Sequence, residues 1–235
     1  MVTKKLIVNA DDLGQSIAIN EGIIMAHKEG IVTSASLMVR YDTTDDAAEY
    51  VSKTPKLGVG LHVDLGEWIY NDGEWTPLYE VVSLDDVNAV EDEINKQLES
   101  FIRIMKRNPT HIDSHQHVHQ RVGLCPVFLS LARKLNVTLR GCSSIVNYCG
   151  DFYGQSTEGF AFHKGISVAG LTKTIEKVSA GITELACHPG LTSDIKTMYG
   201  MERQMEVATL CDKSIKQKII DEGIELCSFE GIPFQ

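Results

Sequence analysis

Residues 6–14 read LIVNADDLG, and residues 17–29 follow closely as IAINEGIIMAHKE. The first stretch is an apolar run of strand length that ends in polar residues, and the second carries apolar residues at helical spacing. Ser16 suits the N-cap of this helix, and Gly30 suits its C-terminal stop. A strand followed by a helix is one βα unit, and a chain of such units forms a parallel sheet with right-handed crossovers.

The same alternation of strand and helix continues along the whole chain. Further strands are predicted at 34–39, 57–63, 110–115, 137–142, 183–187 and 224–229. Further helices are predicted at 43–52, 85–107, 126–135, 168–180 and 202–222. About seven parallel strands in one α/β domain over residues 1–235 favour an incomplete (β/α) barrel, and an open doubly wound sheet is the alternative.

One segment, residues 66–82, interrupts the alternation with the sequence GEWIYNDGEWTPLYEVV. Asn71-Asp72-Gly73 suits a turn between two aromatic arms. Trp68 and Trp75 are the two tryptophans of the chain, and aromatic faces suit sugar rings. The insertion is therefore interpreted either as a lid over a site or as an anchor to the body of the protein or to another subunit.

Composition excludes several classes of partner. The chain is 43% hydrophobic and 23% charged, which is ordinary for a globular protein, and its net charge is −10. This negative charge disfavours nucleic acid and anionic membranes as partners. We expect a cytoplasmic protein, because no apolar run is long enough for a signal peptide or a membrane span. The six cysteines contain no CxxC pair and are expected to be reduced.

The richest cluster of chemistry-bearing residues is HIDSHQHVH at 111–119, where every second residue is His or Asp. Side chains two apart on a strand point to the same face, so this pattern would gather imidazoles and a carboxylate on one side of a strand and its following loop. Neutral imidazole is a common metal ligand and the usual acid–base group near pH 7. A solvated His-rich loop with adventitious metal affinity is the alternative.

Other predicted strands also end in Asp or His. Asp11 and Asp12 follow the first strand, His62 lies in the third, and His188 follows a late one. Ligands bind at the carboxyl ends of parallel strands, so these residues should lie close to His115 at one end, the mouth, of the barrel. One carboxylate and two imidazoles can hold a divalent cation, which lowers the pKa of bound water.

Adjacent carboxylates such as Asp11 and Asp12 point in opposite directions on a strand unless the strand ends between them. One of them could bind a metal while the other acts as general base, and a turn or helix N-cap at 12–14 is the alternative. His188 precedes a rigid Pro-Gly pair and is predicted to lie across the mouth from the first strand, where it could protonate the leaving group. A buried structural histidine is its alternative.

Five blocks of sequence resemble the YdjC/ChbG family of carbohydrate deacetylases. They are LIVNADDLG, GIVTSASLMV, VGLHVDL, PTHIDSHQHVH and ELACHPG, and they span nearly the whole chain in the expected order. The resemblance implies a polysaccharide-deacetylase-like barrel and hydrolysis of an acetamide on an amino sugar or short oligosaccharide. It also implies one divalent cation, usually assigned as magnesium.

The resemblance also implies roles for individual residues. Asp12 matches the metal carboxylate, His62 and His115 match the two metal imidazoles, Asp11 matches the catalytic base, and His188 matches a late histidine. Zinc is a close alternative to magnesium, because magnesium prefers oxygen ligands over imidazole.

The family block often reads SHHHVH, whereas this chain has Gln116 at the second His, which makes position 116 a poor ligand. His117 and His119 could instead complete a two-metal phosphoesterase or cyclic amidase, which is one alternative function. A non-catalytic metal- or sugar-binding module is another. Arg40 and Arg140 could meet an anionic group, but solvated or ion-paired arginines are favoured. The sugar and its phosphorylation are left open, and a homodimer is the working expectation.

Overall fold

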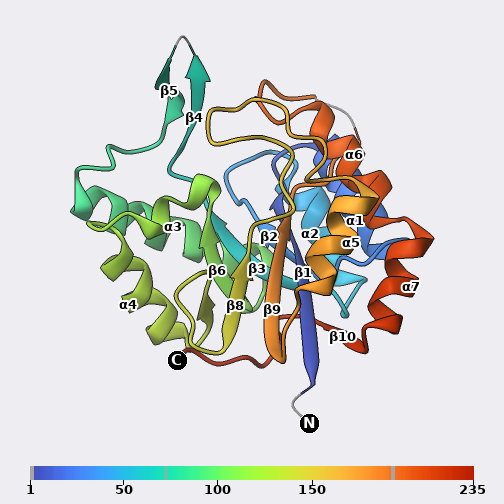
Figure 1. The fold of residues 1–235 in the computed structure, drawn as a ribbon. Coiled ribbons are helices and arrows are strands. Elements are labelled where there is room, and N and C mark those ends of the chain that lie inside the picture. The colour runs from blue at the N-terminus through green and yellow to red at the C-terminus, as the bar shows by residue number, and fades with distance from the viewer. Residues whose placement is uncertain (1–2, 72, 192–193) are drawn as a thin grey trace.

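Parallel strands form the centre of the protein in the computed structural model, which describes residues 3–71, 73–191 and 194–235 (Figure 1). Seven strands pair in the order β7-β6-β3-β2-β1-β9-β8, and β10 pairs with the first residues of β1. Their bounds are β1 Lys4–Leu13, β2 Ser34–Leu37, β3 Gly58–Val63, β6 His111–Ser114, β7 Thr138–Leu139, β8 Val146–Cys149, β9 Gly181–Cys187 and β10 Ile224–Cys227. The path curves into a nearly closed barrel, which confirms the predicted incomplete (β/α) barrel of seven parallel strands.

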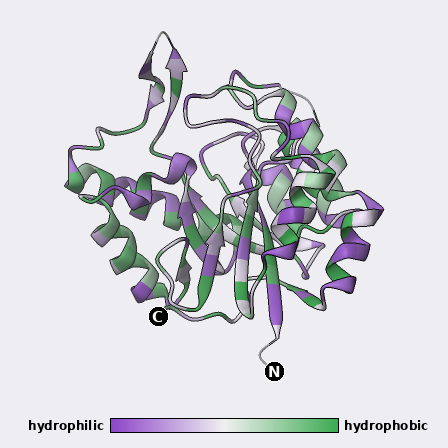
Figure 2. Cartoon of the chain, viewed as in Figure 1, coloured by the Kyte–Doolittle hydropathy of each residue, from purple (hydrophilic) through white to green (hydrophobic). Residues whose placement is uncertain are grey.

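The strands form here because their sequences are apolar on both faces. All six residues of β3 are buried, as are the last eight of β1. Strands covered on both sides have near-continuous apolar sequences, in contrast to the alternation of half-exposed sheets. Figure 2 shows hydrophobic colour over much of the barrel strands, interrupted by hydrophilic bands, and a mixture of colours on the surrounding helices.

Helices surround the barrel and bury one apolar stripe each. Their bounds are α1 Ile17–Lys28, α2 Thr44–Ser52, α3 Val87–Met105, α4 Cys125–Leu135, α5 Val168–Glu176, α6 Met201–Leu210 and α7 Lys213–Asp221. Ser16 caps α1 as expected, because its side chain accepts a hydrogen bond from the Ile19 amide at 3.2 Å. Among the described residues, no helix combines the length and the hydropathy needed to cross a bilayer.

Two predicted elements differ most from the structure. The helix expected over 202–222 is two helices, because Asp212 leaves helical geometry and its side chain accepts a hydrogen bond from the Ser214 amide at 2.7 Å, capping α7. The strand expected over 137–142 pairs only at Thr138–Leu139, and the short strand β8 was not predicted. Both β7 and β8 lie at the ends of the strand path, where each has only one neighbour.

The insertion at 66–82 folds as an antiparallel hairpin of β4 Gly66–Asn71 and β5 Glu74–Glu80, which stands off the barrel at the upper left of Figure 1. The predicted turn is consistent with this pairing, although Asp72 itself lies outside the described residues. At the root of the hairpin, Asp64 is fully buried. Its carboxylate accepts hydrogen bonds from the Tyr79 hydroxyl at 3.0 Å and from Arg40 Nη1 at 2.6 Å. This confirms the expectation of a solvated or ion-paired Arg40.

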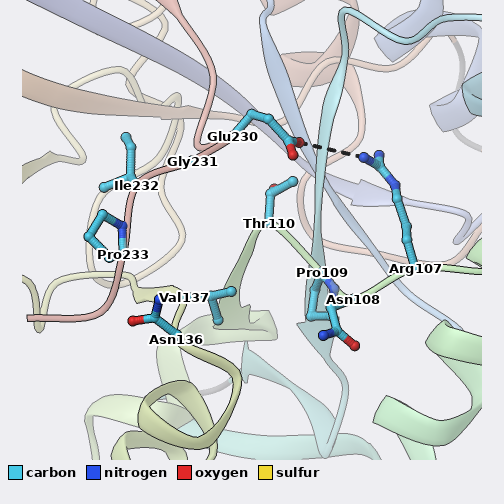
Figure 3. A pocket seen from close by; sticks show the side chains of 10 residues that line it. All are labelled: Arg107, Asn108, Pro109, Thr110, Asn136, Val137, Glu230, Gly231, Ile232 and Pro233. Atoms are coloured by element: carbon cyan, nitrogen blue, oxygen red, sulfur yellow. Dashed lines mark ion pairs between the residues drawn. The ribbon is translucent and has the colours of Figure 1, made fainter.

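A small cavity of about 340 Å³ lies beside the residues that precede β6 and β7, at the amino ends of these strands (Figure 3). Arg107 and Glu230 form an ion pair at its rim, with 3.5 Å between Nη1 and Oε2. The groups of metal-ligand side chains found within the described residues both lie elsewhere. Residues of both groups line a cavity at the opposite end of the barrel.

Candidate functional site

A cavity of about 690 Å³ opens at the carboxyl ends of the barrel strands. Its lining includes all five predicted site residues, which are Asp11, Asp12, His62, His115 and His188. Both tryptophans of the hairpin also line it. Parallel strands place their carboxyl ends at one edge, so the expected convergence of these side chains is what the topology produces.

The end of β1 departs from regular strand geometry and so turns both adjacent carboxylates into the cavity. The pairing of β1 with β2 shifts register between Ala10 and Leu13, and Asp12 has a φ of 68°. This left-handed conformation is tolerated by Asp better than by most residues, and it breaks the alternation that would point Asp11 and Asp12 in opposite directions. The N-cap alternative for residues 12–14 is wrong, because Ser16 caps α1.

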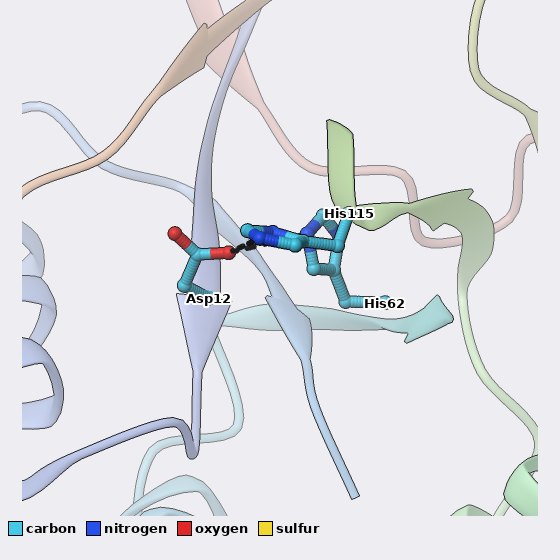
Figure 4. Close-up of side chains that lie close together, drawn as sticks. All are labelled: Asp12, His62 and His115. Carbon is cyan, nitrogen blue, oxygen red and sulfur yellow. Dashed lines mark hydrogen bonds and ion pairs between the residues drawn. The ribbon is translucent and has the colours of Figure 1, made fainter. Parts of the chain in front are cut away.

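Asp12, His62 and His115 form a compact buried cluster (Figure 4). Asp12 Oδ1 lies 3.1 Å from His115 Nδ1 and 3.3 Å from His62 Nε2. One ligand atom from each of the three lies within 4.8 Å of the others. Donor atoms at this spacing suit ligands that sit about 2.0–2.2 Å from a shared ion, and one carboxylate with two imidazoles fits a divalent cation.

Two neighbours hold this cluster in place. Asp113 Oδ1 lies 2.7 Å from His62 Nδ1, so the other ring nitrogen of His62 faces Asp12. A carboxylate on the far nitrogen is the common device that orients a metal-binding imidazole. Arg203 Nη2 donates to Asp12 Oδ2 at 2.7 Å. Burial alone would raise the pKa of Asp12, but Arg203 and His115 outweigh it and hold that pKa well below its ordinary value.

Asp11 is held separately from this cluster, by Arg140. The two guanidinium Nη atoms donate to the two carboxylate oxygens at 2.6 and 2.7 Å, and Asn9 Nδ2 donates to Oδ1 at 2.9 Å. Burial raises the pKa of Asp11, but Arg140 overcomes this and lowers it below the ordinary value. Asp11 is therefore ionised at neutral pH and faces the cavity.

Arg140 is the buried cation that makes this arrangement of charges stable. It is 1% exposed, and it also pairs with Asp113 at 2.8 Å and with Glu184 at 2.7 Å. Of the two expected environments, solvated or ion-paired, Arg140 has the second. Asp11, His62 and Asp113 form a second group of metal-ligand type, but Arg140 already compensates its carboxylates.

His188 lies beside Asp11, with 3.6 Å between His188 Nε2 and Asp11 Oδ2. The predicted position across the mouth is wrong, because β9 pairs directly with β1 and brings the two strand ends together. Burial lowers the pKa of His188 to about 4, so the ring is neutral at pH 7. Its backbone N–H donates to Glu206, whose carboxylate also accepts from the Tyr199 hydroxyl.

The HIDSHQHVH stretch does not continue as a strand. β6 ends at Ser114, and residues His115–Gln120 form a short 3₁₀ segment in which Gln116 and His117 have φ values of 48° and 54°. The alternating pattern therefore holds only for His111 and Asp113, and the later histidines point in separate directions.

Three of these histidines lie outside the cluster around Asp12. His111 stacks on Phe229 with 4.0 Å between ring centroids. His119 is satisfied by the Ser114 hydroxyl at 2.7 Å and the Arg140 carbonyl at 3.1 Å. His117 lines the cavity, with its Nε2 3.1 Å from the Tyr148 hydroxyl. Among the described residues, His117 and His119 join no group of metal-ligand type, which disfavours the two-metal alternative.

The fold and the cavity together define a class of protein. A nearly closed parallel barrel with a carboxylate and two imidazoles in its mouth is a barrel of the polysaccharide-deacetylase type. A solved family 4 carbohydrate esterase from Streptomyces lividans superposes with a TM-score of 0.57, covering 97% of this chain and 93% of that one. At 12% identity, this likeness is one of fold.

The particular family follows from sequence. A family model described as YdjC-like protein matches residues 5–221, and the chain belongs to this family, as the motifs predicted. A carbohydrate deacetylase of Clostridium beijerinckii is 32% identical, covering 97% of this chain and all of the relative. A chitooligosaccharide deacetylase of Citrobacter koseri is 30% identical, covering 95% of this chain and 97% of its own. A solved Enterococcus faecalis protein named for cellobiose-phosphate cleavage is 28% identical, with a TM-score of 0.77 and coverage of 99% and 100%.

Sequence reasoning missed several residues of the site. Arg203 lies inside helix α6, where nothing in the local pattern separates it from a surface arginine. Glu67 also lines the cavity and is buried. Arg140 was noted only as an arginine that could meet an anionic group, although a cation within the apolar predicted strand 137–142 was a usable signal.

Proposed function

We propose that the protein is a metal-dependent hydrolase that removes acetyl groups from N-acetylated amino sugars or short chito-oligosaccharides. The observation that carries the proposal is the buried cluster of Asp12, His62 and His115 beside an ionised Asp11, at the floor of a 690 Å³ cavity lined by aromatic residues. The names of the relatives from Clostridium beijerinckii and Citrobacter koseri support the same reaction class. A cytoplasmic location, a homodimer and a single domain over residues 1–235 stay predictions.

Asp12, His62 and His115 would hold one divalent cation. When bound, it would supply a positive charge that acidifies water and polarises the acetamide carbonyl. Family resemblance favours magnesium, and the two imidazoles favour zinc. Arg203 keeps the Asp12 carboxylate ionised, and Asp113 keeps Nε2 of His62 directed at the same point.

Asp11 and His188 are placed to transfer a proton. Hydrolysis of an amide adds hydroxide to the acyl carbon and a proton to the nitrogen, so one proton must travel from water to the leaving amine. Ionised Asp11 can accept it, and neutral His188 stands 3.6 Å away, where it can receive the proton and donate it to the amine. In this arrangement the two residues act in sequence on the same side of the cavity.

The function is tested by measuring acetate release from N-acetylglucosamine, its di- and trisaccharides and their 6-phosphates, with metal content measured in parallel. We expect release from at least one of these sugars and one cation per chain. Asp12→Ala should lose both the cation and the activity. Phosphate release with two cations per chain would instead indicate a phosphoesterase, and metal binding without any turnover would indicate a binding module.

We predict that His188→Ala keeps the cation and the fold but slows amide hydrolysis about 10²–10⁴-fold, the usual contribution of a general acid or base. An amine leaves poorly unless it is protonated, so an activated acetate ester should be affected much less. The comparison of kcat on the two substrates checks this. Equal losses on both would indicate that His188 positions the acetyl group or stabilises the oxyanion, and no loss on either would make it a structural residue.

A further inference from the structure

The His115 ring and the Glu67 carboxylate, both buried, face each other at the junction between the hairpin and the candidate metal cluster. His115 Nε2 is buried and has no hydrogen-bond partner within the described residues. The Glu67 side chain, on β4, is also buried, and its Oε2 lies 3.8 Å from that nitrogen. A buried carboxylate is unfavourable unless a cation or a hydrogen-bond donor accompanies it, so this facing pair requires an explanation.

His62, in the same cluster, has a carboxylate on the ring nitrogen that faces away from Asp12. One ring nitrogen of His62 faces Asp12, and the other contacts the Asp113 carboxylate at 2.7 Å. His115 has the same arrangement with its nitrogens exchanged, because Nδ1 lies 3.1 Å from Asp12 and Nε2 faces Glu67. Metal-binding histidines usually donate their other N–H to a carboxylate, which sets the tautomer and the orientation of the ring.

We propose that Glu67 is the positioning carboxylate of His115, and that the β4–β5 hairpin delivers it to the metal cluster. The proposal rests on the metal site of the proposed function. It assigns a role to a residue that lies outside the strand ends of the barrel, on a segment that interrupts the βα alternation.

The hairpin is also hydrogen-bonded to the segment that carries His115, through the residues that follow Glu67 and His115. The Gln116 side-chain amide donates to the Trp68 carbonyl at 2.8 Å and accepts from the Trp68 N–H at 2.8 Å. Gln116 follows His115, and Trp68 follows Glu67, so the two contacts are adjacent. Gln116 therefore acts through the hairpin, because it holds β4 at the position where Glu67 reaches His115.

The test is the affinity of the metal-free protein for Zn²⁺, measured by competition with a chelator in the absence of any sugar. Glu67→Gln should weaken Zn²⁺ binding about 10–100-fold, the usual effect of losing a carboxylate behind a metal-binding histidine. Glu74→Gln is the matched control, because Glu74 is exposed on the same hairpin and should bind as the unmodified protein does. Unchanged affinity in Glu67→Gln would overturn the proposal. A loss as complete as that of His115→Ala would also overturn it, by making Glu67 a ligand.

Gln116→Ala tests the route through the hairpin. It should also weaken Zn²⁺ binding. The double variant Glu67→Gln/Gln116→Ala should bind Zn²⁺ no more weakly than Glu67→Gln alone, because each change removes the same contact between Glu67 and His115. Fully additive losses would overturn the role of the hairpin. These measurements need no turnover, so a protein that binds Zn²⁺ as expected but releases no acetate would refute the proposed function and leave this inference standing.

Discussion

Asp11→Asn should lower acetate release about 10²–10⁴-fold while the protein keeps its cation, because this is the usual cost of removing a general base. Asparagine has nearly the shape of aspartate but cannot accept the proton of water as an ionised carboxylate can. Arg140 loses one charge partner in this variant and retains Asp113 and Glu184. The steady-state rate and the metal content of the purified variant check the prediction together.

The unmodified protein and Asp12→Ala are the two controls for this experiment. Asp12→Ala should lose metal and activity together, whereas Asp11→Asn should separate the two. Loss of metal from Asp11→Asn would make Asp11 a ligand and would exchange the proposed roles of the two carboxylates. Unchanged acetate release from every sugar would show that Asp11 is not the general base.

Arg140→Met should give the largest loss of stability. It leaves the carboxylates of Asp11, Asp113 and Glu184 in a buried region without their shared cation. Removing one partner of a buried ion pair costs about 3–5 kcal/mol in the free energy of unfolding, because the remaining charge is left uncompensated. Denaturant unfolding followed by circular dichroism measures this quantity.

Arg107→Met is the matched control, since its ion pair with Glu230 is exposed and should contribute less than about 1 kcal/mol. The deficit of Arg140→Met should also shrink as the pH falls from 7 towards 5. Without the guanidinium, burial raises the folded-state pKa of these carboxyl groups above its unfolded-state value. At a pH below the raised pKa the groups are protonated and the folded state of the variant is stabilised. This stabilisation is lost as the pH rises through that pKa. A deficit equal to that of Arg107→Met, or one independent of pH, would contradict this account.

Much of the architecture could be predicted because it depends on local patterns. Apolar runs separated by amphipathic helices predicted the parallel barrel, and Ser16 correctly marked the start of α1. The placement of Asp12, His62 and His115 in one mouth followed from the common direction of the strands. The break at Asp212 was missed because the apolar pattern of 202–222 continues across it, and only the cap of α7 ends the first helix there.

The position of His188 could not be predicted from local sequence patterns. Its location beside Asp11 depends on β9 pairing with β1, although the two strands are far apart in the sequence. Strand order is set by pairing between distant segments, and nothing in the residues around position 188 encodes it. The left-handed Asp12, which turns both carboxylates inward, depends in the same way on the shifted register between β1 and β2.

By itself, the sequence determined the class of fold, the family and the kinds of side chain that meet at the mouth, because these depend on periodicity and on residues at strand ends. The tertiary structure decided the partner of each side chain. Asp11 meets Arg140 across 129 positions of sequence, and Asp12 meets Arg203 across 191. Such pairs set which carboxylate stays ionised and which ring is oriented, and they exist only once the barrel brings distant strands and helices together.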